Sequence, residues 1–338
     1  MRRVLVARMD SMGDVLVSGP AVRAVAASAE VVLLAGPQGA PAARLLPGVA
    51  EVRVVAAPWI TPTDRPVDED LVAEVRRVVA ETGVTEAVVL TSFHQSPLPL
   101  ALLLRLAGVR RIAGASVDAA GGLLDVRLIP GEDLPEDLPE PVRALRIAEA
   151  AGFPLPPGDD GRLDAVLPPR PAAAGERPYV VVHPGAAVPA RAYPAERCAA
   201  VVELLAARGH RVLVTGGPDE RALTAAVAGG AGVDLGGALG LAELGAVLRD
   251  ADAVVVGNTG PAHLAAAAGT PVVSLFAPVV PAVRWAPWGV PVELLGDRSA
   301  PCRDSRARVC PVPGHPCLAS VAPAAVVDAA ERLVGAAR

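Results

Sequence analysis

Residues 4–20, VLVARMDSMGDVLVSGP, join a short apolar run, a polar turn and a second apolar segment. The run at 4–7 predicts a buried strand, and the segment at 15–27 predicts a helix. Phosphate-binding folds usually place glycines between such a strand and helix, whereas this turn carries two aspartates and a serine. The first strand–turn–helix unit therefore predicts an α/β fold, and it raises the question of why carboxylates stand where such folds usually place glycines.

The same alternation continues through the N-terminal half. Near-continuous apolar strands separated by helices predict a parallel sheet covered on both faces. Further strands are expected at 31–34, 52–55 and 87–90, and helices at 68–81, 98–107 and 141–151.

Residues 153–178 are rich in Pro and Gly, which predicts a linker. The alternation then restarts, with strands expected at 179–182, 211–214, 253–256 and 272–275, helices at 194–207, 218–228 and 241–249, a short helix from Pro261 and a final helix at 322–337. The predicted organisation is an N-terminal α/β domain (1–152), the linker, a C-terminal α/β domain (179–320) and a C-terminal helix (321–338). Two such halves place a ligand at the carboxyl ends of their strands.

The composition limits the possible functions. The 338 residues are 52% hydrophobic and 20% charged with a net charge of −5, which excludes a disordered chain and does not suggest nucleic-acid binding. The chain has no lysine, so a phosphate clamp must use arginine, histidine or backbone N–H groups. Charged residues interrupt the N-terminal apolar run, and we therefore expect no signal peptide and a cytoplasmic location.

Three loops follow predicted strands of the C-terminal half, HPGAAVPARAYP (183–194), TGGPDE (215–220) and GNTGPAHL (257–264). In the last loop, Pro261 suits the first turn of a helix whose N–H groups favour a phosphate or diphosphate. Asn258 and Thr259 either take part in that site or only cap the helix. Because Asn258 is the only asparagine in the chain, the functional interpretation is slightly favoured.

The loop TGGPDE places Asp219 and Glu220 at a predicted helix start. Their carboxylates are suited to accept hydrogen bonds from ribose hydroxyls, or they only complement the helix dipole. No GxGxxG follows the first strand and no GxxxxGK[ST] occurs, which argues against dinucleotide dehydrogenases and P-loop enzymes.

The first turn also has two interpretations. Ser11 and Asp14 have the spacing of a capping box. Alternatively, Asp14 is a general base at the end of the first strand, and Gly13 beside it lets a substrate approach the backbone.

The segments RMDSMGDVLVSGPAVRA, HPGA…R.YPAERCAAV, TGGPDE and GNTGPAHLAAAAGTPVVSLFAPVVPAVRWAPWG occur in this order. Together they resemble the ADP-heptose:lipopolysaccharide heptosyltransferases of glycosyltransferase family 9, over essentially the whole chain. The resemblance implies a GT-B fold, in which two Rossmann-like domains face a central cleft with their parallel sheets. It also implies an inverting, metal-independent transfer of a heptose or similar sugar from a nucleoside-diphosphate donor to a hydroxyl of a glycan or small molecule. The favoured donor is ADP-heptose, and no cofactor is implied.

The resemblance also assigns residues. Asp14 matches the base, with Ser11, Met12 and Gly13 on the acceptor side. Arg191 matches the basic residue that neutralises the leaving diphosphate. The remaining donor-binding positions are Gly185, Asp219 or Glu220 for the ribose, and Asn258, Thr259, Gly260 and His263 for the diphosphate loop.

Family members often carry four cysteines late in the chain. Here Cys302, Cys310 and Cys317 remain, with Ser305 at the other position. Together with His315 they form a conceivable zinc site, but their irregular spacing favours a packed loop without metal.

Two other functional classes stay open. One is a nucleotide-sugar 2-epimerase of the same fold, which needs no acceptor; the other is a non-catalytic nucleotide-sugar binding protein. We expect loops 56–67 and 91–97 to shape the acceptor site, no nucleic-acid partner, and a peripheral membrane association as an open alternative.

Overall fold

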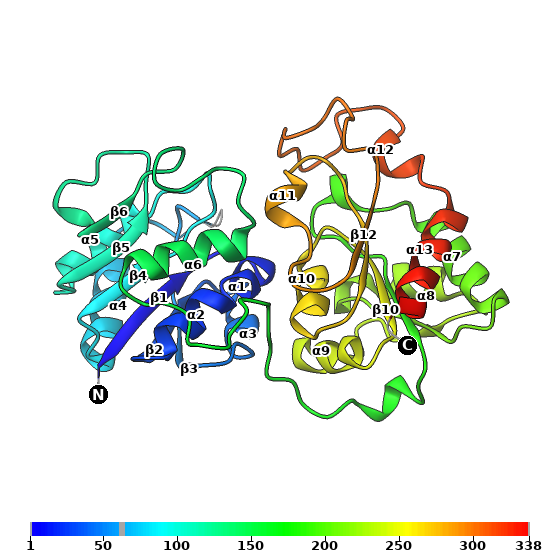
Figure 1. Cartoon of the computed structure of the whole chain (residues 1–338), viewed down its shortest axis with the longest axis horizontal. Coiled ribbons are helices and arrows are strands. Elements are labelled where there is room, and N and C mark those ends of the chain that lie inside the picture. The colour runs from blue at the N-terminus through cyan, green and yellow to red at the C-terminus, as the bar shows by residue number, and fades with distance from the viewer. Residues whose placement is uncertain (1, 61–64, 337–338) are drawn as a thin grey trace. The chain divides into compact units, whose positions relative to one another are not determined.

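The computed structural model shows two compact units, Met1–Val166 and Leu167–Arg338 (Figure 1). The division lies inside residues 153–178, which the composition marks as a linker.

The structure describes residues 2–60 and 65–336. Residues 61–64, in the expected acceptor loop, and 337–338, at the end of the expected final helix, lie outside the described residues. No helix in the described part of the chain has both the length and the apolar character needed to cross a bilayer.

The first unit is built on a parallel sheet of six strands in the order β3-β2-β1-β4-β5-β6, counted over the described residues. The register of each neighbouring pair is parallel. The strands are β1 (Arg3–Arg8), β2 (Glu30–Ala35), β3 (Val49–Val54), β4 (Glu86–Val89), β5 (Arg111–Ala115) and β6 (Val126–Leu128).

Helices cover both faces of this sheet (Figure 1). On one face, Leu5 and Val32 of the sheet belong to a buried cluster with Leu71 of α4 and Leu104 of α5. On the other face, α2 packs against α6 and against β2. The helices are α1 (Met12–Val17), α2 (Gly19–Ala26), α3 (Ala40–Ala43), α4 (Glu69–Thr82), α5 (Leu98–Leu106) and α6 (Glu140–Ala150), with a 3₁₀ turn η1 (Gly121–Leu123).

The second unit repeats this plan. Its parallel sheet has the order β12-β11-β10-β7-β8-β9 among the described residues. The strands are β7 (Val180–His183), β8 (Val212–Val214), β9 (Val233–Asp234), β10 (Ala253–Gly257), β11 (Val272–Leu275) and β12 (Val292–Leu295).

Val182 and Val255 of this sheet share one buried cluster with Val201 of α7 and Val326 of α13, while α9 and α10 pack together on the sheet's other side. The helices are α7 (Ala195–Ala207), α8 (Arg221–Ala228), α9 (Leu241–Arg249), α10 (Gly260–Ala267), α11 (Ala282–Trp285), α12 (Pro316–Ala319) and α13 (Pro323–Ala336), with 3₁₀ turns η2 (Ala172–Ala174), η3 (Pro189–Arg191) and η4 (Pro218–Glu220). The expected C-terminal helix, α13, thus packs as part of the second unit.

The strand order locates the sites. In each sheet the chain starts at a central strand, builds outward to one edge, and then returns to build the other half. The order reverses between β1 and β4 in the first unit and between β7 and β10 in the second. Open α/β sheets bind ligands at such a reversal, outside the carboxyl ends of the strands. The residues that follow these four strands are therefore the candidates for ligand contact.

The single helix expected at 15–27 is wrong, because the structure contains two helices there. The first begins at Met12, earlier than expected, so Asp14 lies inside it. It ends at Val17, because Pro20 in the first turn of α2 has no N–H for a continuous helical ladder.

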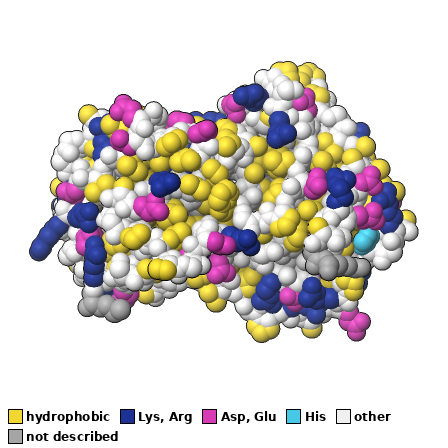
Figure 2. Space-filling model, in the orientation of Figure 1, with side chains coloured by type: hydrophobic (Ala, Val, Ile, Leu, Met, Phe, Trp, Pro, Cys, Tyr) yellow, Lys and Arg dark blue, Asp and Glu magenta, His cyan; other side chains and the backbone are white. Residues whose placement is uncertain are grey.

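The face of the molecule drawn in Figure 2 carries charged side chains of both signs. On the face drawn in Figure 2, acidic and basic side chains are interspersed among hydrophobic and neutral ones. This agrees with the small net charge of −5.

Candidate active site

Asp14 lies in the first turn of α1, directly after the carboxyl end of β1. Its Oδ2 accepts hydrogen bonds from the Ser11 backbone N–H (3.3 Å) and from the Ser11 hydroxyl (2.6 Å). The capping interpretation of this pair is therefore confirmed. The Asp14 side chain is still 17% exposed, so capping does not prevent contact with a substrate.

A buried arginine holds the other oxygen of this carboxylate. Arg8 Nη2 lies 3.0 Å from Asp14 Oδ1, 3.0 Å from Asp10 Oδ2 and 2.9 Å from Ser92 Oγ. Arg8 Nη1 lies 3.9 Å from Glu140 Oε2. The Arg8 and Glu140 side chains are each only 1% exposed, so the charges of this cluster interact with little screening by water.

The protonation of Asp10 responds to this cluster. Burial raises the pKa of Asp10, the Arg8 guanidinium opposes that rise, and the charge of Asp14 adds to it. Asp10 and Asp14 therefore repel each other across the arginine that both contact.

Arg8, Asp10 and Glu140 were not predicted from the sequence as site residues, and Ser92 was predicted only as part of the expected acceptor loop 91–97. Arg8 and Asp10 carry a usable signal, because charged residues directly after a buried strand end face the ligand edge of a parallel sheet. Ser92 follows β4, the strand beside β1. We find no sequence signal for Glu140.

The other acceptor-side residues differ in access. Ser11 is exposed and Met12 is half-buried. Gly13 is buried within α1, which differs from the expectation that a substrate reaches its backbone.

In the second unit, the three loops expected to form one site do meet at one edge of the sheet. They follow β7, β8 and β10, which are parallel neighbours in the order β10-β7-β8. Their carboxyl ends therefore lie side by side, at the reversal of strand order.

Arg191 lies beside the start of α10. Its Nη1 donates a hydrogen bond to the backbone carbonyl of Asn258 at 3.4 Å. The chain passes so closely that a Cβ on Gly257 would lie 2.9 Å from the Arg191 carbonyl oxygen, which explains the glycine. A guanidinium and a helix N-terminus thus converge, and both favour an anion.

The side chain of Asn258 connects two loops. Its Nδ2 donates to the Ala277 carbonyl at 3.3 Å, and its Oδ1 accepts from the Ala277 N–H at 3.2 Å. The residue is 5% exposed. The Asn258 amide therefore joins the loop before α10 to the segment after β11, and its expected contact with the donor stays a prediction.

Thr259 is the N-cap of α10, and Gly260 and Pro261 open its first turn. The Thr259 hydroxyl is buried and makes no hydrogen bond within the described residues. Buried hydroxyls usually have a partner, so this one is suited to a ligand at the helix N-terminus.

His263, one turn further along α10, is buried, and its ring meets Trp285 edge-on at 6.3 Å between centroids. The Trp285 Nε1 likewise has no partner among the described residues, and the sequence analysis did not predict this residue.

The two candidate ribose carboxylates differ. Glu220 Oε2 accepts from the Gly217 N–H at 2.7 Å. A Cβ on Gly185 would lie 2.0 Å from Glu220 Oε1, so Gly185 gives this carboxylate its place beside the loop after β7. Asp219 is exposed on η4.

His183 ends β7 below these loops. Its Nδ1 lies 3.0 Å from Thr215 Oγ1, and its Nε2 lies 4.0 Å from Glu220 Oε2. Burial lowers the pKa of His183 to about 4, and the Glu220 charge opposes the decrease. The imidazole is therefore neutral at pH 7.

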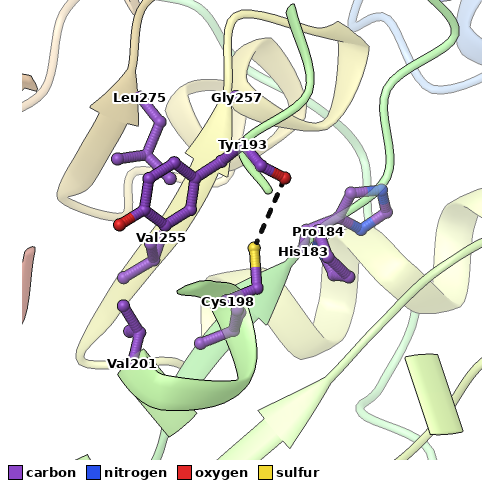
Figure 3. A pocket seen from close by; sticks show the side chains of 9 residues that line it. His183, Pro184, Tyr193, Cys198, Val201, Val255, Gly257 and Leu275 are labelled. Atoms are coloured by element: carbon purple, nitrogen blue, oxygen red, sulfur yellow. Dashed lines mark hydrogen bonds between the residues drawn. The ribbon is translucent and has the colours of Figure 1, made fainter. Parts of the chain in front are cut away.

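A small cavity lies below the same edge (Figure 3). Its volume is about 10 Å³, room for one water molecule and far too little for a nucleotide. Tyr193 and Cys198 line it, and the Cys198 thiol donates to the Tyr193 carbonyl at 4.0 Å. The cavity belongs to the core that supports the loops.

The late cysteine segment shows no metal-binding arrangement. No group of three or more His, Cys, Asp or Glu side chains within residues 2–60 and 65–336 is placed to hold a metal ion. Cys302 and Cys317 are buried, Cys310 is half-buried, and His315 Nε2 hydrogen-bonds the Ala190 carbonyl at 3.1 Å.

Comparison with known proteins relates the chain to one family of glycosyltransferases. Residues 148–315 match the model of the family described as Glycosyltransferase family 9 (heptosyltransferase). A lipopolysaccharide heptosyltransferase 3 from Escherichia coli is 35% identical over 161 residues, which cover 45% of this chain and 45% of that relative. The chain thus matches less than half the length of this relative.

Two solved structures share the fold over nearly all of both chains. A family 9 glycosyltransferase from Veillonella parvula has a TM-score of 0.77 at 15% identity, over 99% of this chain and 98% of that one. The E. coli heptosyltransferase WaaC, solved with ADP-2-deoxy-2-fluoro heptose, has a TM-score of 0.71 at 22% identity, over 98% and 99%. The GT-B fold class is confirmed, and residues 148–315 match the model of glycosyltransferase family 9.

Proposed function

We propose that this protein is an inverting, metal-independent glycosyltransferase. It moves a heptose or similar sugar from a nucleoside-diphosphate donor to a hydroxyl of a glycan or small-molecule acceptor. The favoured donor is ADP-heptose. Asp14 is the general base, and Arg191 with the N-terminus of α10 receives the diphosphate.

The observation that carries the proposal is the approach of Arg191 to the start of α10, at the strand reversal of the second sheet. Departure of a diphosphate from the sugar develops negative charge on the leaving group. A guanidinium and helix N–H groups that already point there stabilise this charge without reorganising. The unsatisfied Thr259 hydroxyl adds a further donor at the same place.

Asp14 has the properties of the base. It follows β1 at the reversal of the first sheet, and its carboxylate keeps some exposure. A base must lie within hydrogen-bond reach of the acceptor hydroxyl whose proton it takes. In this structure the Ser11 hydroxyl makes such a contact with Oδ2, at 2.6 Å. We propose that the acceptor hydroxyl replaces Ser11 at this oxygen.

The choice of ADP-heptose comes from the relatives. The matched family is described as heptosyltransferases, and the WaaC structure contains an ADP-heptose analogue. The matched segment, residues 148–315, includes Arg191, Glu220 and the start of α10. Of the two candidate carboxylates, we assign the ribose to Glu220, because its neighbour Gly185 lies at the end of β7, on the side of Arg191.

Two measurements on the purified protein test the function. A panel of nucleotide sugars, screened by thermal shift, should give the largest rise in melting temperature with ADP-heptose, because a ligand that binds only the folded state stabilises it. ADP should then be released only when an acceptor from a set of glycans and alcohols is added. Conversion of the donor without an acceptor indicates an epimerase, and binding without conversion under every acceptor indicates a binding protein.

A further inference from the structure

The turn after β1 contains more charge than a single general base requires. Asp10 and Asp14 contact the same Arg8 nitrogen, each at 3.0 Å, so their two oxygens are no farther apart than twice that distance. The Ser92 hydroxyl lies 3.1 Å from Asp10 Oδ2 and 3.4 Å from Asp14 Oδ1. These four side chains therefore form one hydrogen-bonded unit.

An arginine at this distance has two opposing effects on a base. It fixes the orientation of the carboxylate, which favours catalysis. Its positive charge also stabilises the ionised carboxylate, which weakens it as a proton acceptor. A neighbouring negative charge cancels the second effect while the first remains.

We propose that Arg8 and Asp10 are positioning residues of the transfer reaction: Arg8 holds Asp14 Oδ1 so that Oδ2 meets the acceptor, and the charge of Asp10 preserves the basicity of Asp14. The inference rests on the proposed role of Asp14 as the base. Asp10 is itself 6% exposed and touches no acceptor in this account, so its effect passes through Arg8 and Asp14.

The surroundings of the unit support this division of roles. Glu140 of α6 adds a third carboxylate beside Arg8 at 3.9 Å, so the arginine is surrounded by more negative charge than it neutralises. The mutual repulsion of Asp10 and Asp14 contributes to the raised pKa of Asp10, behind the larger contribution of burial. Because this repulsion is mutual, an ionised Asp10 also favours protonation of Asp14.

Other charged groups on the elements packed against α1 have their own partners. Arg143 of α6 donates to the Thr91 carbonyl at 2.9 Å. Arg23 of α2 pairs with Asp159 at 2.6 Å, and Arg44 after α3 donates to the Ala40 carbonyl at 3.1 Å. The variants below leave these groups unchanged, except where Arg23 and Asp159 serve as controls.

The first measurement needs no substrate. Carbon NMR of the carboxyl groups, with the Asp14 signal assigned from Asp14→Asn, gives the pKa of Asp14 in each variant. We expect Asp10→Asn to lower that pKa by about one unit, because a nearby negative charge is removed. Asp159→Asn is the control, because it also removes the carboxylate of a partly buried ion pair with an arginine, Arg23, elsewhere in residues 1–166. It should leave the pKa of Asp14 unchanged.

The second measurement is the pH dependence of kcat/KM for sugar transfer. A weaker base loses its proton at lower pH. Asp10→Asn should therefore shift the acid limb of the pH profile to lower pH by the same amount as the pKa of Asp14. The plateau should fall about threefold, since general-base efficiency follows basicity. A merely structural role of Asp10 would lower activity at every pH without moving the limb.

Arg8→Lys tests whether Arg8 orients the Asp14 carboxylate, and it provides the test of the proposal if Asp10→Asn does not fold. Lysine keeps the charge but lacks the planar fork, so we expect kcat to fall about tenfold while the KM for the donor stays unchanged. Arg23→Lys, the matched control, should leave both parameters unchanged.

An Asp14 pKa that Asp10→Asn does not move overturns the proposal. A moved pKa with an unmoved kinetic limb also overturns it and leaves the proposed function intact. A wild-type protein that transfers no sugar contradicts the proposed function itself, and the positioning role with it.

Discussion

Arg191 is the residue on which leaving-group stabilisation depends most. Arg191→Ala should lower kcat by about a hundredfold and raise the donor KM only a few-fold, because the charge it meets grows toward the transition state. Steady-state kinetics with varied donor measure both. Arg197→Ala is the control, since Arg197 donates to the Val321 carbonyl at 3.1 Å and should leave kcat unchanged. A change confined to the donor KM would make Arg191 a binding residue only.

Variants of Glu220 and Asp219 distinguish a carboxylate that contacts the ribose from one that only complements the helix dipole. Glu220→Gln should weaken ADP binding about tenfold, because a charge-assisted hydrogen bond to ribose becomes a neutral one. The amide can still accept from the Gly217 N–H, so the local structure is retained. Asp219→Asn should change the affinity little. Calorimetric titration of both variants with ADP decides, and the reverse ranking would move the ribose contact to Asp219.

At this scale, the sequence predicted the residues that stand in recognisable patterns. The spacing of Asp14 to Ser11 predicted the capping box, whereas its role as the base was predicted from its place after a strand and from the resemblance to glycosyltransferase family 9. Glu140 was not, because its partner Arg8 is more than a hundred positions away and only the packing of α6 joins them. Asn258 was identified as unusual, but its bonds to Ala277 depend on the fold of a later loop.

At the scale of the elements, His183 at the end of β7 makes the stability of the fold depend on pH. In the folded protein His183 stays neutral down to about pH 4, whereas an unfolded histidine binds a proton below about pH 6.5. Its contribution to stability is therefore fully present above pH 6.5 and is lost as the pH falls toward 4, by up to about 3 kcal/mol.

Urea unfolding of wild type and His183→Gln at several pH values between 7.5 and 4.5 measures this contribution. We expect the free energy of unfolding of the variant to fall less steeply below pH 6.5. Parallel curves for the two proteins would show that His183 does not titrate as the structure implies.

Most strands and helices were predicted within a few residues, and the misses have physical reasons. β5 contains Gly114 and small side chains, and a Cβ at Gly114 would lie 3.3 Å from Pro97, so packing decides this strand more than propensity does. β6 and β9 are short edge strands, and their periodicity is too brief to recognise. The break between α1 and α2 did have a signal, Gly19–Pro20, which the apolar pattern outweighed in our prediction.

For the whole molecule, the repetition of one strand order in both units is the finding that organises the chemistry. Asp14 and Ser92 follow the two strands at the first reversal, and Arg191 and Thr259 follow the two at the second. The alternating pattern predicted two parallel sheets, but not which strands are neighbours. Adjacency depends on crossover connections, and it became visible only in the structure.

This arrangement also predicts how the enzyme responds to chelation. Arg191 and the N-terminus of α10 are two fixed positive sources at the expected diphosphate site. We therefore expect full transfer activity in excess EDTA, measured as ADP release with acceptor present. Loss of activity on chelation, restored by added magnesium, would contradict the metal-free mechanism.

The central claim is that Asp14 is the base of a sugar transfer from ADP-heptose. Asp14→Asn keeps the shape of the side chain and its contact with Ser11 but cannot take a proton at neutral pH. The most direct test compares kcat of this variant and of wild type at saturating ADP-heptose and acceptor, with donor affinity measured in parallel. The account predicts an unchanged donor affinity and a kcat lower by at least about a hundredfold. A kcat close to that of wild type would contradict it.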